Sequence, residues 1–282
     1  MAEGTPRASG SSPSRSRRVL RTLGLGLITG AADDDPSAIG TYASAGAAIG
    51  PSFLWTAPVT FPMMCAVVYL SAKLGQVAGK GLFHVIKDHY SGWILYPALI
   101  GVLIGNTIEA GADIGGMSAA IAVLLPVPMP FIIIPVTVAI FALQVWGSYK
   151  LIRNIFRWLA LTLLAYVGAA ILAKPDLIDV IKGTLIPSIQ FNEKFLSLLV
   201  AVIGTTLSAY LYTWQSNQEV EEEIAKGRRE LSHRKGATKK ELQHTRADVI
   251  SGMFFSNLVM YFIILSTAST LFKSGSTEID TA

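Results

Sequence analysis

The sequence predicts an all-α integral membrane protein with about seven transmembrane helices, the first and the sixth of them broken. Three observations predict this class. Hydrophobic residues make up 51% of the chain and charged residues only 15%, and the mean hydropathy is +0.49, unlike a soluble domain. Apolar runs also recur at close to the roughly 20 residues that cross a bilayer as a helix. The expected spans lie near residues 19–48, 51–72, 93–125, 126–149, 154–173, 195–218 and 249–272.

The segments outside the spans set the orientation. Residues 1–18 are Ser-rich and basic without an apolar period, so we expect a disordered cytoplasmic arm rather than a cleavable signal. With this N-terminus inside, the cytoplasmic segments hold every Lys and Arg except Lys174, Lys182, Lys194 and Lys273, in agreement with the positive-inside rule. The basic balance therefore indicates anionic lipid headgroups at a plasma or inner membrane and needs no nucleic-acid partner.

The first expected span contains acids where a membrane helix should have none. Residues 24–50 read GLGLITGAADDDPSAIGTYASAGAAIG, so Asp33, Asp34 and Asp35 interrupt a run of small and apolar residues. Three aspartates facing lipid would oppose insertion by roughly 8 to 10 kcal/mol, and a straight helix would turn them to different sides. Pro36 disfavours helical geometry before it, so we expect a helix break around Pro36 and Ser37. This break can form an oxygen-rich pocket for a hard divalent cation; the alternative is a proline kink with protonated or hydrated acids.

The third expected span carries a second set of polar side chains. Asn106, Glu109 and Asp113 follow one another at spacings of three and four residues, which places them on one helix face. The two acids repel each other unless they are protonated, hydrated or bridged by a cation. This face is therefore predicted to contact a metal or to line its path, and the alternative is the wall of a vestibule.

The sixth expected span holds no charge before Glu219 but contains Gly204, Thr205, Thr206 and Ser208. Their oxygens could occupy a second helix break at Gly204, or the hydroxyls could bond back to the preceding turn. A highly charged cytoplasmic linker is expected at residues 217–248. The polar residues 273–282 are expected on the outer side.

These two spans carry a family resemblance. The first resembles the NRAMP family of divalent-metal transporters, in which an Asp-Pro-Gly-Asn motif lies between a Gly-x-Gly start and an Ala-Gly-Ala end; this chain reads GLG, DPSA and AGA. The sixth is similar to the family's second broken helix, which carries Ala-x-x-Met-Pro-His. The resemblance extends over residues 19–272 and implies the inverted-repeat, leucine-transporter-like fold, here in a form shortened at its C-terminal side. It also implies a metal held between these spans by Asp35 and the backbone carbonyl of Thr205.

The chain departs from the family pattern at three positions. Ala38 stands where the family has a ligand asparagine, Ser208 where it has methionine, and Tyr210 where it has the histidine linked to proton movement. Without a soft sulfur ligand the preference moves toward hard ions, and Mg²⁺ suits a roomy pocket of oxygens because it keeps several waters. The sequence is thus similar to NRAMP-related magnesium transporters, with Asp33 and Asp34 compensating for the missing ligands.

The expected function is transport of a divalent metal cation, Mg²⁺ or Mn²⁺, by alternating access, with the ion as substrate and without a cofactor. One alternative is a membrane-embedded, Mg²⁺-dependent transferase acting on a prenyl or phospholipid diphosphate, although the relevant spans lack the basic residues that grip phosphates. Another is a non-transporting subunit or a fragment, because the second repeat is incomplete. In that case a further chain could supply the missing helices.

Overall fold

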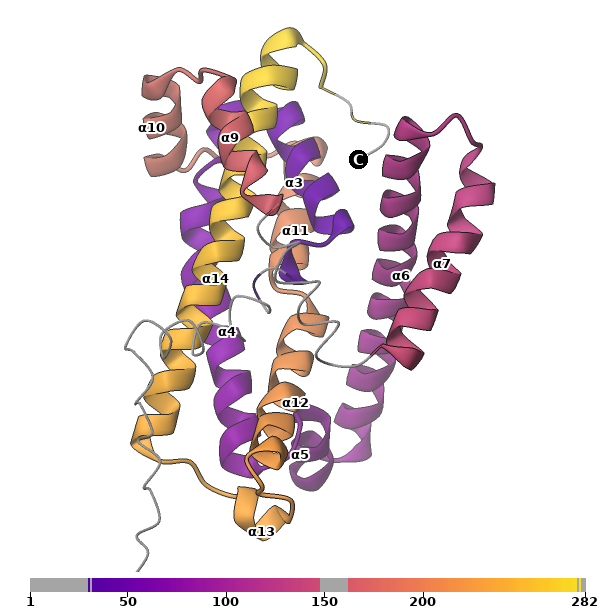
Figure 1. Ribbon diagram of the computed structural model, residues 1–282. Helices are drawn as coiled ribbons and strands as arrows, with labels where there is room; N and C mark the ends of the chain where they lie inside the picture. The colour runs from indigo at the N-terminus through magenta and orange to yellow at the C-terminus, as the bar shows by residue number, and fades with distance from the viewer. Residues whose placement is uncertain (1–29, 31, 148–161, 278, 280–282) are drawn as a thin grey trace, which may run out of the picture.

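The computed structural model describes residues 30, 32–147, 162–277 and 279. These residues form helices joined by turns and short connections (Figure 1). The expected cytoplasmic arm, the start of the first span up to residue 29 and residues 154–161 of the fifth span lie outside the described residues.

Five of the predicted spans are present as helices long and apolar enough to cross a bilayer. They are α4 (Thr56–Ala78), α6 (Gly92–Leu124), α7 (Met129–Trp146), the pair α11 (Glu193–Thr206) and α12 (Ala209–Ala225), and α14 (Lys239–Thr267) with its π-helical continuation η2 (Ala268–Phe272). Helix α3 (Pro36–Ile49) is the second half of the first span, and α9 (Ala165–Leu172) lies in the fifth. The shorter elements η1 (Gly50–Phe53), α5 (Leu82–His89), α10 (Leu177–Leu185) and α13 (Leu231–Arg234) lie in the connections.

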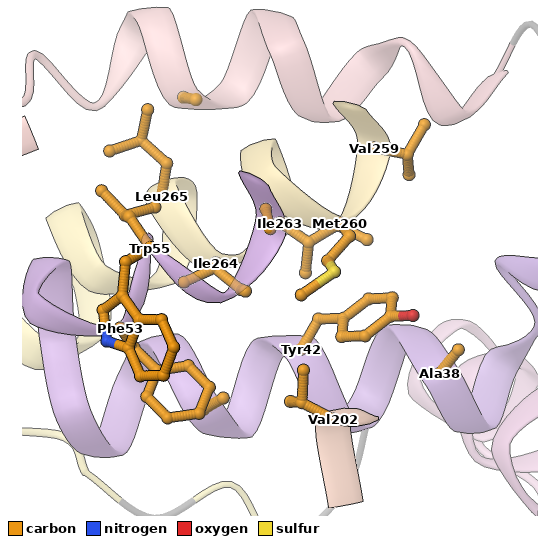
Figure 2. Packing of buried hydrophobic residues seen from close by; sticks show 14 of the residues in the cluster. Ala38, Tyr42, Phe53, Trp55, Val202, Val259, Met260, Ile263, Ile264 and Leu265 are labelled. Atoms are coloured by element: carbon orange, nitrogen blue, oxygen red, sulfur yellow. The ribbon is translucent and has the colours of Figure 1, made fainter. Parts of the chain in front are cut away.

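Helix α3 lies at the centre of the main apolar core, packed against α11 and α14 (Figures 1 and 2). Tyr42 of α3, Val202 of α11 and Met260 of α14 are all fully buried there. The approach of α14 to α3 is close because α3 carries small residues: a Cβ added at Gly46 would lie 2.4 Å from the carbonyl oxygen of Ile264. Small residues allow this kind of backbone contact between membrane helices.

Helices α6 and α7 form a hairpin that stands to one side of the other helices in Figure 1. Helix α6 contacts α3 and α12, yet large apolar side chains on both helices of the hairpin are exposed, among them Ile104, Ile108, Phe131 and Phe141. Such faces suit contact with lipid or with further membrane helices.

A buried polar network joins α4, α12 and α14 at the end of the molecule where α5 and α13 lie. The Gln76 amide donates to Glu219 Oε2 at 2.7 Å and to Thr245 Oγ1 at 2.6 Å, and Gln215 donates to Glu219 Oε1 at 2.8 Å. Glu219 is only 7% exposed. The Gln76 amide of α4 therefore ties together the buried carboxylate of α12 and the Thr245 hydroxyl of α14.

Helices enter the charged segment 217–248 from both sides. Helix α12 continues to Ala225 and α14 begins at Lys239, where Thr238 and Glu241 form a reciprocal N-terminal cap. Arg228 pairs with both Glu223 of α12 and Glu241 of α14. Helical capping and ion pairing thus order both ends of this charged segment.

Candidate functional site

The first span is broken where the proline predicts. Ala32 and Asp33 are helical, Asp34 forms a bend, and α3 begins at Pro36. Asp35 is the N-cap of α3, with extended backbone (φ −73°, ψ 171°) and a side chain whose Oδ1 accepts from Ala38 N at 2.7 Å and from Ser37 Oγ at 2.8 Å. An aspartate N-cap followed by proline is a favoured helix start, because the ring fits the first helical position and the carboxylate accepts from free N–H groups. Ser37 itself lies within α3.

The sixth span is also broken, but later than predicted. Helix α11 ends at Thr206, Leu207 and Ser208 are not helical, and α12 begins at Ala209. The prediction of the break at Gly204 needs correction, because Leu207 N still donates to the Ile203 carbonyl at 3.1 Å and keeps Gly204 inside the helix. The carbonyls of the last α11 turn, including that of Thr205, lie beyond this final helical hydrogen bond. Such carbonyls are free to bind a partner.

The third span meets the first break at Ser37. Helix α6 approaches the start of α3 closely, since a Cβ added at Gly116 would lie 3.1 Å from Pro36 Cβ. This places Asp113 on α6 so that its Oδ1 accepts from Ser37 N at 3.1 Å. The carboxyl groups of Asp113 and Asp35 are then close enough to interact. Two facing carboxylates require a proton or a cation between them.

A cavity of about 430 Å³ connects the two breaks and the third span. Its lining includes six of the residues that the sequence singled out: Ser37, Asn106, Glu109, Gly204, Thr205 and Ser208. Asp35 is not part of the lining and reaches it through its hydrogen bond to Ser37. Among the described residues no three His, Cys, Asp or Glu side chains are close enough together to hold one metal. An ion here would therefore depend on backbone and hydroxyl oxygens and water besides its carboxylates.

Several other predicted site residues do not line this cavity, although Tyr210 lies close enough to Glu109 and Asp113 to interact with them. Asp33 and Asp34 are buried against Ser256 of α14. Ala38 is fully buried, and its methyl group offers no ligand atom. The Thr206 hydroxyl donates back to the Val202 carbonyl at 2.6 Å, and the Tyr210 ring stacks on Trp214.

Sequence reasoning missed the part of the site region on α14. Ser256 contacts both Asp33 and Asp34, and neighbouring Asn257 donates to Thr60 Oγ1 at 3.2 Å. The signal was available, because Asn257 is the one amide side chain in the span 249–272 and polar groups in membrane helices usually face protein.

A helical membrane bundle with two broken spans facing one cavity is typical of inverted-repeat transporters. The model of the family described as natural resistance-associated macrophage protein-like (Nramp) matches residues 26–282. The chain therefore belongs to the Nramp family. Members of this family are metal transporters and not enzymes, so the family assignment gives no support to the transferase alternative.

The chain is similar to transporters from several bacteria. It is 26% identical over 269 residues to the divalent metal cation transporter MntH of Bacillus subtilis, covering 92% of this chain and 60% of that protein. It is 27% identical over 292 residues to MntH of Klebsiella pneumoniae, covering 97% of this chain and 64% of that protein. The chain thus spans less than two thirds of the length of these relatives.

Solved structures of the Eremococcus coleocola manganese transporter share the fold. A complex with an aromatic bis-isothiourea compound superposes with a TM-score of 0.67 at 19% identity, covering 93% of this chain and 53% of that one. A mutant of the same transporter gives a TM-score of 0.64 at 18% identity, covering 96% of this chain and 55% of that one. The predicted fold class, a partial inverted-repeat helical bundle, is confirmed.

Proposed function

We propose that this chain binds a divalent metal cation between the two helix breaks and takes part in moving it across the membrane by alternating access. The observation that carries the proposal is the cavity that joins Ser37, Glu109, Thr205 and Ser208 from three separate spans. Helix ends supply free carbonyls and N–H groups at mid-membrane, and acids beside them attract cations. The carboxyl pair of Asp35 and Asp113 provides the negative charge at one edge of this cavity.

The donor set favours a hard ion, Mg²⁺ or Mn²⁺. The polar groups of the cavity carry oxygen in hydroxyl, carboxylate, carbonyl and amide groups, and the lining includes no thioether. Oxygen ligands suit Mg²⁺, Ca²⁺ and Mn²⁺, whereas thioether sulfur suits softer metals. The relatives' names, a divalent metal cation transporter and a manganese transporter, support a divalent substrate. Asn106 and Tyr210 would then act along the ion's path rather than as its ligands.

Transport would use the two groups of helices described above. The ion lies between the hairpin α6–α7 and the bundle around α3, so a movement of one against the other would expose it to either side in turn. Because the chain spans about 60% of the length of MntH, the transporting unit would include further helices, from the same gene product or from a further chain. We place it in the plasma or inner membrane with the N-terminus in the cytoplasm, as the distribution of Lys and Arg favours.

The function is tested by separating the charge of Asp35 from its role as helix cap. Asn and Asp cap helices equally well, whereas Ala at an N-cap costs about 1 kcal/mol. Asp35→Asn is therefore expected to keep the thermal unfolding temperature and to weaken Mn²⁺ binding at least tenfold, since it removes the charge that holds the ion. Asp35→Ala is expected to lower both the unfolding temperature and the affinity for Mn²⁺. Binding is measured with Mn²⁺ by electron paramagnetic resonance, and uptake in proteoliposomes made from the full-length protein.

Two results would count against this function. Mn²⁺ affinity unchanged in Asp35→Asn would exclude the carboxylate as a ligand, and metal uptake that continues in Asp35→Asn at the wild-type rate would exclude the site from transport. Asp176→Asn is the matched control, because Asp176 is likewise an N-cap, of α10, and lines a different cavity together with Asp179. It should change neither measurement.

A further inference from the structure

Asp33 and Asp34 do not line the cavity, although Asp33 lies close enough to Asp35 and Glu109 to interact with them electrostatically. The side chains of Asp33 and Asp34 are only 3% and 4% exposed. Ser256 Oγ donates to Asp33 Oδ2 at 2.8 Å and lies 3.5 Å from Asp34 Oδ1. A hydroxyl has one hydrogen to donate, so both carboxyl groups converge on a single donor. Asp33 Oδ1 and Asp34 Oδ2 are buried without any hydrogen-bond partner in the described part of the chain.

These two carboxyl groups lack a countercharge within the described residues. The ion pairs of the described chain involve Lys80, Lys226 and Arg228, all near the other end of the bundle, and none involves Asp33 or Asp34. Adjacent carboxylates buried without compensation are strongly unfavourable. A positive charge from outside the chain would remove this penalty.

The Tyr42 hydroxyl is a separate sign of a missing ligand. Tyr42 is fully buried, and its Oη has no hydrogen-bond partner among the described residues. Figure 2 shows the hydroxyl directed along α3 toward Ala38, the end of the helix that Asp35 caps. Tyr42 also lies close enough to Asp33, Asp34 and, with a smaller effect, Asp35 to interact with them electrostatically. A buried tyrosine hydroxyl normally finds a partner, so an oxygen ligand is left over beside two acids.

Close packing holds these groups in place. A Cβ added at Gly30 would lie 2.1 Å from the carbonyl oxygen of Gly252, so the backbone at Gly30 lies directly against α14. Ser256 follows Gly252 by one helical turn, which brings its hydroxyl to the acids that follow Gly30. The arrangement thus depends on backbone contact between two helices and not on mobile side chains.

We propose that Asp33 and Asp34, with Ser256 and Tyr42, form a second cation site that is separate from the cavity and takes a hard divalent ion. Two carboxylates balance a charge of two, and carboxylate and hydroxyl oxygens are the ligands that Mg²⁺ and Mn²⁺ accept, completed by water. Since the acids come from the first half-helix and Ser256 from α14, an ion here would hold these two helices together. The site does not require the cavity to bind or transport metal.

The test counts bound ions in the full-length protein. Wild type titrated with Mn²⁺ alone, with free ion followed by electron paramagnetic resonance, is expected to bind two ions per chain. The double variant Asp33→Asn/Asp34→Asn and the variant Asp35→Asn are each expected to bind one, having lost different ions. Tyr42→Phe should weaken one of the two sites about tenfold. Tyr261→Phe should leave both sites unchanged, because the Tyr261 hydroxyl is already paired, at 2.8 Å, with the hydroxyl of Thr184 in α10.

Clear outcomes would overturn the second site. A single bound ion in wild type, or two bound ions in the double variant, contradicts it, and so does unaltered Mn²⁺ affinity in Tyr42→Phe. Failure of Asp35→Asn to release an ion would count against the proposed function while leaving this inference intact. Unfolding temperatures measured in chelator check that the variants fold; the double variant should not fall below wild type there, because it removes two uncompensated charges.

Discussion

The network around Glu219 gives a stability prediction whose size follows from its hydrogen bonds. Gln76 donates to the buried carboxylate at 2.7 Å and to Thr245 at 2.6 Å. A hydrogen bond to a charged group contributes about 1.5–3 kcal/mol and one to a neutral group about 0.5–1.5 kcal/mol. Gln76→Ala is therefore expected to destabilise the protein by about 3 kcal/mol, which lowers the unfolding temperature by about 6–12 °C in a chain of this size.

The measurement is thermal unfolding in detergent, followed by the fluorescence of the tryptophans. Gln190→Ala is the matched control, because Gln190 is exposed and its side chain accepts only from Asn192; we expect its unfolding temperature to stay at the wild-type value. A double-mutant cycle of Gln76→Ala with Glu219→Ala should yield a coupling of about 1 kcal/mol or more. An additive cycle, or an unfolding temperature of Gln76→Ala equal to that of Gln190→Ala, would refute the reasoning.

Three further predictions concern the site, the core and the surface. Ser208→Met should raise the preference for Cd²⁺ over Mg²⁺ in competition titrations, because it adds a soft ligand to the cavity; an unaltered order would remove Ser208 from the site. Gly46→Ala should destabilise by about 1–3 kcal/mol in thermal unfolding because its Cβ has no room, while Gly168→Ala, where nothing lies within 4 Å, should not destabilise. The hydrogen bond from Lys80 holds the pKa of Asp88 below its usual range. The pair therefore stabilises the folded protein at pH values above the ordinary aspartate pKa of about 4, and this stabilisation is lost as the pH falls through the lowered pKa of Asp88. Lys80→Ala should raise that pKa in an NMR titration, and an unshifted titration would contradict the pairing.

Most of the fold could be predicted because spanning a membrane is a local requirement. Twenty or so apolar residues form a helix whatever their neighbours, since lipid offers the backbone no other partner. The first break was predictable for the same reason: Pro36 removes a donor and constrains Asp35 regardless of tertiary contacts. The second break was less predictable. Gly204 permits a break but does not force one, and the helix continues to Thr206 because hydrogen bonding through Ile203 and Leu207 is still available.

The placement of the site residues depends on contacts between distant parts of the chain. Ser37 and Asp113 are 76 residues apart, and Asp33 and Ser256 are 223 residues apart. A helical face could be assigned to Asn106 and Glu109 from spacing alone, but spacing does not say which helix that face meets. Only the packing of α6 on Pro36 decides that Asp113 reaches Ser37.

The break also explains how neighbouring acids in one sequence motif can serve two places. In a straight helix Asp33 and Asp35 would lie about 200° apart and one of them would face lipid or an apolar neighbour. Here Asp33 ends one half-helix against α14, and Asp35 begins the next as its cap beside Asp113. Each carboxylate is therefore surrounded by protein, but no ion pair of the described residues involves Asp33 or Asp35. If metal balances the charge at both places, neutralising one acid should release one ion and leave the other bound. Release of both ions by either substitution would instead indicate a single site shared by these acids.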